Sequence, residues 1–346
     1  MKTYSRRNMI IAGLTTGLLT IASLPTTAAA ASATIRVAYN LPKDHATGLY
    51  FETLAKEIEK LTATTSLKLK VRTFPNGQLY NDTQLPDAVS TGAVEIGQMN
   101  IGFMNGPGTE ALRVWGLPFL YNSWEALWAT EDNPVFKNTF NEQFGKFDMH
   151  MLGWVQYGTV EFYASKPIHL PADLKGLRLR AFGVDTSMLI RDLGGSPVSL
   201  SSQEMYQAVQ RGTIDGFITG PTSVYSRKLF EVAKHGTTIG VNYLSFMATA
   251  NLGWWNKLPA DTRDAITAAS DIAQTTARER AKSDDQRAKE LLKEQGVVAY
   301  VPTAAERQQW VDASKGLYDA YREKSGSIGA ELLKIAEAAN KKYAAQ

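Results

Sequence analysis

The spacing of hydrophobic and polar residues predicts alternating strands and helices in the first part of the chain. Residues 67–74 (LKLKVRTF) alternate apolar and polar side chains, which is typical of a strand with one buried face. Residues 49–61 instead carry apolar side chains at helical spacing, with Glu and Lys between them. Residues 34–39 and 94–99 are predicted strands, and residues 82–90 a predicted helix. This order predicts a largely parallel sheet with right-handed crossovers.

The second half of the chain repeats this α/β order and then turns helical. Residues 177–182 (LRLRAF) predict a strand, and residues 201–204 (SSQE) form a capping box that predicts a helix ending at Gly212. Residues 259–293 predict one helix about 50 Å long at about 1.5 Å per residue, so we expect it to span two domains. The other predicted elements are strands at 149–156, 214–219 and 297–301, strand-like segments within 240–253, helices from Ser123 and at 186–193, and two C-terminal helices.

Residues 1–31 have the pattern of an export signal. Residues 1–7 are basic without any acid, residues 9–24 are apolar, and small residues follow, as in a secretory signal peptide. Residues 5–9 (SRRNM) also resemble a twin-arginine signal. The alternative is an uncleaved membrane anchor, which Pro25 and several Gly and Thr residues disfavour because the apolar run is short. We therefore expect a cleaved signal peptide and a periplasmic protein.

Charge and composition exclude some classes of partner. The formal net charge is +3, and Lys2, Arg6 and Arg7 of the leader account for it, so the mature chain is neutral. A neutral chain of about 315 residues argues against a nucleic-acid or membrane-surface partner. The chain contains no Cys, so the exported protein needs no disulfides. Its length fits two domains.

Four ordered segments resemble those of a known family. They are residues 74–79 (FPNGQL), 117–120 (LPFL), 171–180 (PADLKGLRLR) and 204–216 (EMYQAVQRGTIDG). Across essentially all of the mature chain, the sequence resembles the substrate-binding proteins of TRAP transporters, the DctP type. The resemblance implies a periplasmic-binding-protein-like α/β fold. It consists of two α/β domains with mixed, mostly parallel sheets, joined by crossing strands and a long domain-spanning helix.

The resemblance also implies a division of the chain and a set of partners. We expect a signal peptide at residues 1–31, domain I at 32–156 plus 243–283, and domain II at 157–242 plus 284–346. The ligand is expected to be a small organic acid in the cleft between the domains. The expected receiver is a sodium-coupled permease with a small and a large subunit, and the receptor itself is expected to be a monomer.

In this family the last arginine of the GLRLR segment pairs with the ligand carboxylate, and here that residue is Arg180. From its strand position alone, Arg180 would more often be a solvated edge charge than a fixed cation, because most arginines are exposed. A planar guanidinium offers two parallel N–H donors that match a carboxylate. A closed cleft that excludes water strengthens such a pair. The resemblance therefore favours Arg180 as the carboxylate anchor.

Other family-matched positions have both a ligand-binding and a local structural interpretation. Asn81, Asp82, Asn100 and Ser202 could each contact the ligand. The alternative for Asn81 or Asp82 is a helix N-cap, for Asn100 a turn at the end of a strand, and for Ser202 a position next to the helix cap. We expect His45 to be a solvated loop residue. The aromatic residues Tyr157, Phe182 and Trp254 either form walls of the cleft or belong to the ordinary core.

The chain departs from the family pattern in two places. Val160 stands where the family often has a second basic residue, and Glu161 lies beside it. In the cleft, Glu161 would repel a dicarboxylate and could accept an ammonium group; the alternative is an outward strand position. Phe217, Ile218 and Thr219 replace a frequent Glu-Asn, so the wall keeps one hydroxyl and becomes more apolar. We therefore predict a monocarboxylate with an apolar or aromatic body.

Two alternative functions compete with binding for transport: an enzyme and a periplasmic sensor. The sequence has no G-x-S-x-G, H-E-x-x-H, P-loop or G-x-G-x-x-G after a strand, and its four histidines show no ligand spacing. We therefore expect neither an enzyme nor a cofactor, and no metal-binding residues. A periplasmic sensor that presents the same acid to a receptor would have the same sequence features, so that alternative stays open.

Overall fold

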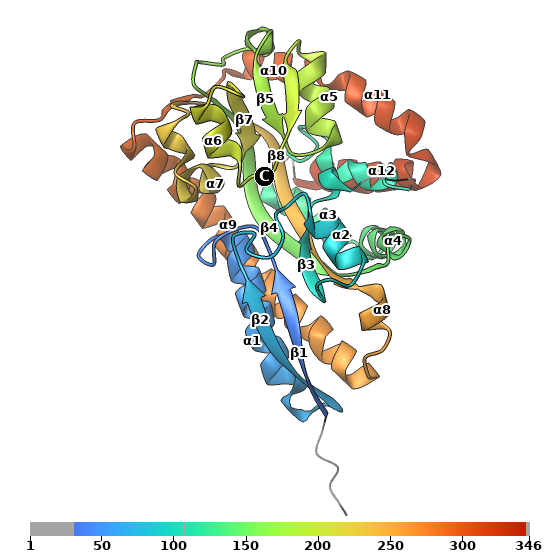
Figure 1. Ribbon diagram of the computed structural model, residues 1–346. Coiled ribbons are helices and arrows are strands. Elements are labelled where there is room, and N and C mark those ends of the chain that lie inside the picture. Colours follow the sequence, from blue (N-terminus) through green and yellow to red (C-terminus); the bar gives the residue numbers. More distant parts are fainter. Residues whose placement is uncertain (1–30, 105, 107, 344–346) are drawn as a thin grey trace, which may run out of the picture.

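Two long strands, β4 (Met149–Ala164) and β8 (His235–Asn251), run through the centre of the molecule and carry the rest of the sheet (Figure 1). The computed structural model describes residues 31–104, 106 and 108–343. β4 and β8 pair antiparallel within a nine-stranded sheet of order β2-β1-β3-β8-β4-β7-β5-β6, with β9 paired to β8. Because the two strands are long, one end of the pair joins the first group of strands and the other end joins the second.

The first group of elements is called lobe I. Its parallel strands are β1 (Ala31–Ala38), β2 (Leu67–Phe74) and β3 (Ile96–Met99), and β3 pairs antiparallel with the C-terminal part of β8. The helices α1 (Ala46–Leu61) and α2 (Leu85–Ser90) connect these strands. The predicted β-α-β-α-β order and its parallel pairing are therefore correct.

The second group of elements is called lobe II. Its parallel strands are β5 (Arg178–Ala181), β6 (Ser196–Ser199) and β7 (Gly216–Thr219), and β7 pairs antiparallel with the C-terminal part of β4. The helices α5 (Val184–Asp192) and α6 (Met205–Gln210) connect them. Lobe II thus repeats the construction of lobe I, as the sequence pattern predicted.

Helix α9 (Ala260–Glu294) has 35 residues and runs along both lobes (Figure 1). It packs against α1 of lobe I, against β4, and against α7 (Pro221–Ser226) on the side of lobe II. Its buried residues recur at helical spacing from Ile266 to Leu292, so one face is buried along almost the whole helix. The predicted domain-spanning helix is confirmed.

Three expectations about single elements were wrong. β4 continues to Ala164 and does not end near residue 156. The sequence pattern missed the extension because almost every residue of β4 is buried, so apolar and polar residues do not alternate regularly. The capping box at residues 201–204 is only half formed: the Glu204 carboxylate accepts the backbone N–H of Ser201, but Ser201 Oγ is buried without a partner among the described residues. The chain ends in three helices instead of two, namely α10 (Ala304–Ala313), α11 (Lys315–Lys324) and α12 (Gly326–Tyr343).

The remaining elements complete the surface. The predicted signal peptide lies outside the described residues, apart from Ala31. Among the described residues, no helix is long and apolar enough to cross a membrane. Helix α12 packs against α3 (Trp124–Glu131) and η3 (Ala111–Gly116). The residue boundaries of the two domains stay a prediction. The other elements are η1 (Thr62–Thr64), η2 (Ile101–Phe103), η3 (Ala111–Gly116), α3 (Trp124–Glu131), α4 (Pro134–Gly145), η4 (Pro171–Leu174), η5 (Leu229–Glu231), α8 (Leu252–Trp255) and β9 (Val298–Tyr300).

Candidate functional site

A narrow cavity lies between the lobes, beside the crossing strands. Its volume is ≈ 20 Å³, which is room for about one water molecule, so the lobes are closed upon each other. Residues from lobe I, from β4 and β8, and from lobe II all contribute to it. The lining residues are Asn40, Leu41, Asp82, Asn100, Tyr157, Arg180, Phe182, Ser202, Thr219, Ser223, Leu244 and Phe246.

Arg180 lines this cavity and is 3 % exposed. Its Nε donates to Leu200 O at 3.1 Å and its Nη1 to Ile218 O at 3.3 Å, so backbone carbonyls fix the plane of the guanidinium. Nη2 faces Asp82 at 3.5 Å. Burial lowers the pKa of Arg180 and the Asp82 carboxylate opposes that shift; an arginine nevertheless stays charged. Arg180 is therefore a buried, oriented cation and not a solvated edge charge.

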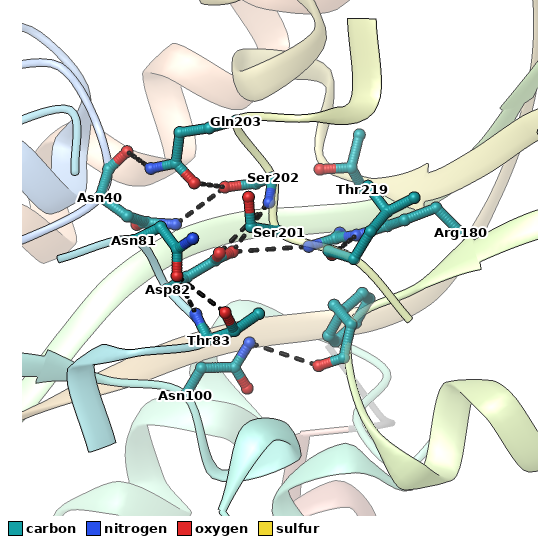
Figure 2. A network of polar contacts seen from close by, with 12 residues as sticks. Asn40, Asn81, Asp82, Thr83, Asn100, Arg180, Ser201, Ser202, Gln203 and Thr219 are labelled. Atoms are coloured by element: carbon teal, nitrogen blue, oxygen red, sulfur yellow. Dashed lines mark hydrogen bonds and ion pairs between the residues drawn. The ribbon is translucent and has the colours of Figure 1, made fainter. Parts of the chain in front are cut away.

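Asp82 reaches across from lobe I and lies between Arg180 and Ser202 (Figure 2). Both of its carboxylate oxygens lie 3.2 Å from the backbone nitrogen of Ser202. Its neighbour Asn81 lies outside the cavity, where its side chain accepts the backbone N–H groups of Thr83 and Gln84. Asn81 therefore stabilises the turn before α2, whose N-cap is Gln84, and Asp82 is the residue of this pair that lines the cavity.

Arg227 is a second cation that the sequence analysis missed. Its Nη2 donates to Asn40 O at 2.5 Å, and its Nε is buried without a partner among the described residues. Burial lowers the pKa of Arg227, and the charge of Asp82 opposes that shift. Val160, which stands where the family often has a second basic residue, is fully buried in the core. No motif marked Arg227, because it reaches the cavity region only through tertiary packing.

Tyr157 and His45 form one wall behind the cavity. Tyr157 Oη accepts the backbone N–H of Gly220 at 2.9 Å and lies 2.8 Å from Thr219 Oγ1. The His45 ring stacks on Tyr157 with ring centroids 5.4 Å apart. His45 Nδ1 accepts the N–H of Thr47, so Nε2 carries the proton and donates to Thr222 Oγ1 at 2.9 Å. The expectation of a solvated His45 was wrong: it is a buried N-cap of α1, and burial lowers its pKa to about 3.

The other predicted residues divide between the cavity and the core. Asn100 and Ser202 line the cavity and join the lobes, since Asn100 Nδ2 donates to Phe182 O at 3.3 Å and Ser202 Oγ accepts from Asn40 Nδ2 at 3.0 Å. Phe217 is fully buried and stacks near Tyr163 in the core of lobe II. Trp254 in α8 packs at the edge of the main core, outside the cavity lining. The ligand-binding role of the lining residues stays a prediction.

Glu161 neither faces the cavity nor points outward, so both interpretations were wrong. It is 1 % exposed, and its Oε2 accepts the backbone N–H groups of Ile239 and Gly240 at 2.8 Å each. Lys289 of α9 lies 3.6 Å from Oε1 and also pairs with Asp285 at 2.9 Å. The β4–β8 register shifts between Val160 and Phe162, and this bulge turns the carboxyl toward β8 and α9. Burial raises the pKa of Glu161 to about 7, with Lys289 opposing the shift.

We expect Glu161 to make the folded state less stable as the pH rises from about 5 to 8. The carboxyl has a pKa of 4.5 before folding and about 7 in the folded protein, so only the folded state keeps the proton between these values. Its stabilising contribution is complete below pH 4.5 and is lost as the pH rises through 7, with an upper limit of about 3 kcal/mol. Calorimetric melting of the protein and of Glu161→Gln at several pH values measures it.

The melting temperature of the unsubstituted protein, minus that of Glu161→Gln, should fall as the pH rises. Glu142→Gln, on an exposed face of α4, is the matched control and should give a constant difference. A difference for Glu161→Gln that is also constant between pH 5 and 8 would contradict the raised pKa.

The two lobes also touch directly beside the cavity, through two glycines. A Cβ atom added to Gly183, the N-cap of α5, would lie 2.5 Å from the Cα of Gly102 in η2 of the opposite lobe. Nearby, Arg113 of η3 pairs with Asp185 of α5, and both side chains are largely buried. These contacts join η2 and η3 to α5 on the Asn100 side of the cavity.

Comparison with known proteins places this architecture in a family. The family model for bacterial extracellular solute-binding proteins, family 7 (DctP), matches residues 37–324. A C4-dicarboxylate-binding periplasmic protein DctP from Vibrio cholerae is 30 % identical over 278 residues, which cover 80 % of this chain and 82 % of the relative. The DctP protein of Rhodobacter capsulatus is 28 % identical over 294 residues, 84 % of each chain.

A solved structure agrees with these sequence matches. The TRAP periplasmic solute-binding protein of Shewanella oneidensis, with bound succinate, superposes with a TM-score of 0.83 at 25 % identity. The superposition covers 90 % of this chain and all of the other. With the fold, the closed interdomain cavity and the family match in agreement, this chain belongs to the DctP family of solute-binding proteins of TRAP transporters.

Proposed function

We propose that this protein captures a small monocarboxylate between its lobes, holds the carboxylate on Arg180, and delivers the acid to a sodium-coupled permease of two subunits. Proteins of this family are solute-binding receptors and not enzymes, and the named DctP relatives are periplasmic. That the ligand is a small carboxylate follows from the family. The preference for one carboxylate rests on the charges around the cavity.

The buried charge around the cavity is the observation that carries this proposal. Of the described groups, Arg180 and Asp82 line the cavity with opposite charges, and Arg227 adds a second cation where it holds Asn40. His45 is neutral, because burial lowers its pKa to about 3. The sum is one positive charge, which a single carboxylate neutralises. A second carboxylate would be buried without a partner, which is costly.

The walls of the cavity support an apolar body on the ligand. Leu41, Tyr157, Phe182, Leu244 and Phe246 surround the polar groups. Binding pockets commonly combine such apolar walls with a few placed polar groups. The Phe182 ring also lies 5.7 Å from the Arg180 guanidinium, a cation–π contact that fixes both side chains.

Binding requires the lobes to open, because ≈ 20 Å³ does not admit an organic acid. The crossing strands offer hinges at their register shifts, between Met151 and Gly153 and between Gln156 and Gly158. The ligand then stabilises the closed form by its differential affinity for that form. A permease that recognises the closed form would thereby distinguish loaded from empty receptor.

The competing ligand class is a C4-dicarboxylate, because the two DctP relatives are named for it. A thermal-shift screen of mono- and dicarboxylates, aromatic acids, amino acids and sulfonates separates the two. We expect the largest stabilisation from monocarboxylates with an apolar or aromatic body. Stabilisation by C4-dicarboxylates alone would contradict the proposal. Unimpaired uptake of the bound acid by a strain that lacks the protein would contradict its role in transport.

The charge count predicts the effect of Arg227. Arg227→Gln makes the cavity neutral before the ligand enters, so a monocarboxylate would bring an uncompensated negative charge. We expect calorimetric affinity to fall about ten- to a hundredfold, or about 1.4 to 2.8 kcal/mol. Lys228→Gln removes the same charge from the exposed neighbouring residue and should change affinity little. Equal effects of the two variants would show that Arg227 does not contribute to the cavity's charge balance.

A further inference from the structure

The cavity presents oxygen acceptors on lobe I opposite the guanidinium on lobe II. Asn40 Oδ1 is buried without a partner, and Asp82 lies with its carboxylate 3.5 Å from Arg180. We propose that the ligand is a 2-hydroxy monocarboxylate. Arg180 holds its carboxylate, and Asn40 and Asp82 accept its hydroxyl hydrogen. This inference rests on the proposed function and adds the chemical class of its ligand.

The free acceptor on Asn40 follows from its neighbours. The Ser202 hydroxyl donates its hydrogen to Gln203 Oε1 at 3.3 Å, so it must accept from Asn40 Nδ2 at 3.0 Å. This fixes the amide with Oδ1 left over. The backbone of Asn40 is held as well, since its N–H donates to Gln98 Oε1 and its carbonyl accepts from Arg227. Asn40 is 3 % exposed, so its unused oxygen is a fixed acceptor at the cavity.

The Asp82 carboxylate can accept a further hydrogen bond. Its two oxygens share a single backbone donor, Ser202 N, at 3.2 Å each, and the contact with Arg180 is long. A carboxylate has about four lone-pair sites, so it can accept a further hydrogen. Leaving buried acceptors without donors destabilises the closed form. A ligand that brings a donor removes part of this cost, and a ligand without one does not.

The position of the donor follows from the short distance between the two charged groups. Arg180 Nη2 and Asp82 Oδ2 are 3.5 Å apart, so a group that touches Asp82 must lie close to the carboxylate held by Arg180. A hydroxyl on the carbon next to the carboxylate meets this condition. A 2-oxo group would instead direct its own oxygen at the acceptors, without a hydrogen between them.

The charge balance favours a hydroxyl over an ammonium group. With Arg180, Arg227 and Asp82, the site carries one positive charge, which a hydroxy acid neutralises. An amino acid is a zwitterion and would leave that charge buried and uncompensated. The ligand therefore needs a neutral donor, which distinguishes a hydroxy acid from the amino acid of the same skeleton.

Calorimetry on the mature protein tests this with sets of acids that differ only at the second carbon. Each set contains the 2-hydroxy, 2-oxo, 2-amino and unsubstituted acid, with a methyl, isopropyl or phenyl body. In the set that binds most tightly, we expect the hydroxy acid to bind at least about tenfold more tightly than the other three. Equal or weaker binding of the hydroxy acid would overturn the inference and leave the proposed monocarboxylate function standing. Failure of every monocarboxylate would overturn both.

Two variants locate the effect. Asn40→Ala and Asp82→Asn should each bring the affinity ratio of hydroxy to unsubstituted acid closer to one. Asn81→Ala, next to Asp82 but outside the cavity lining, should leave the ratio unchanged. If the affinity ratio of hydroxy to unsubstituted acid is unchanged in both Asn40→Ala and Asp82→Asn, the assignment of these two acceptors is wrong. The same ratio measured on the unsubstituted protein decides the ligand class, even where a variant folds poorly.

Discussion

Replacing Arg180 with Ala is expected to weaken carboxylate binding by roughly thirtyfold to several thousandfold, since removing one partner of a buried charge pair costs on the order of 2–5 kcal/mol. Arg180 is 3 % exposed and fixed by two backbone carbonyls, so no other described cation can take its place in the same geometry. Arg180→Lys should be nearly as damaging, because an ammonium group cannot offer two parallel donors.

The neighbouring strand position supplies a matched control for Arg180. Arg178 is exposed at the surface of lobe II and pairs with Asp215 at 2.8 Å, so Arg178→Ala removes the same charge without touching the cavity. Its effect on affinity should be small. Titration calorimetry on both variants, with melting curves to establish folding, gives the comparison. Near-native affinity of Arg180→Ala for the acid would contradict its role as anchor.

Gly183→Ala is expected to weaken ligand binding by roughly five- to a hundredfold, by holding the lobes apart. The added Cβ would lie 2.5 Å from the Cα of Gly102 and 3.1 Å from its carbonyl oxygen, so the closed lobes must separate. Overpacking of this kind costs typically about 1–3 kcal/mol. The backbone at Gly183 is extended, with φ 162° and ψ −179°, so the expected cost comes from the opposite lobe.

Because the collision is between α5 of lobe II and η2, which follows β3 of lobe I, it should act on closure and not on folding. Small-angle scattering with saturating ligand should show a larger radius of gyration for Gly183→Ala than for the unsubstituted protein. Gly316→Ala in α11 has no atom within 4 Å of the added Cβ and serves as the control. Native affinity together with native compaction in Gly183→Ala would show that the glycine contact does not limit closure.

The sequence predicted best the elements whose pattern is local. β2 was predicted at its observed bounds, Leu67–Phe74. One face of this edge strand is more exposed than the other, so its apolar and polar residues alternate visibly in the sequence. β4 and β8 were underestimated, because strands buried on both faces and interrupted by bulges have no regular alternation. Glu161 was misplaced for the same reason, since a bulge changes which way a side chain points.

The candidate site was predicted only at positions that could be matched to the family. Arg180 was identified by resemblance, while its partner Asp82 lies 98 positions away and was offered only as an alternative to Asn81. Arg227 contacts Asn40 from 187 positions away, and His45 contacts Thr222 from 177. Periodicity describes the neighbours along one element, and it carries no information on which distant side chains meet in a cavity.

We propose that the net positive charge of Arg180, Arg227 and Asp82 selects a ligand with a single carboxylate. The most direct test is a calorimetric titration of the mature protein with a monocarboxylate that binds and with the dicarboxylate of the same carbon skeleton. We expect one monocarboxylate to bind per chain, at least about tenfold more tightly than the dicarboxylate. Tighter binding of the dicarboxylate would contradict it.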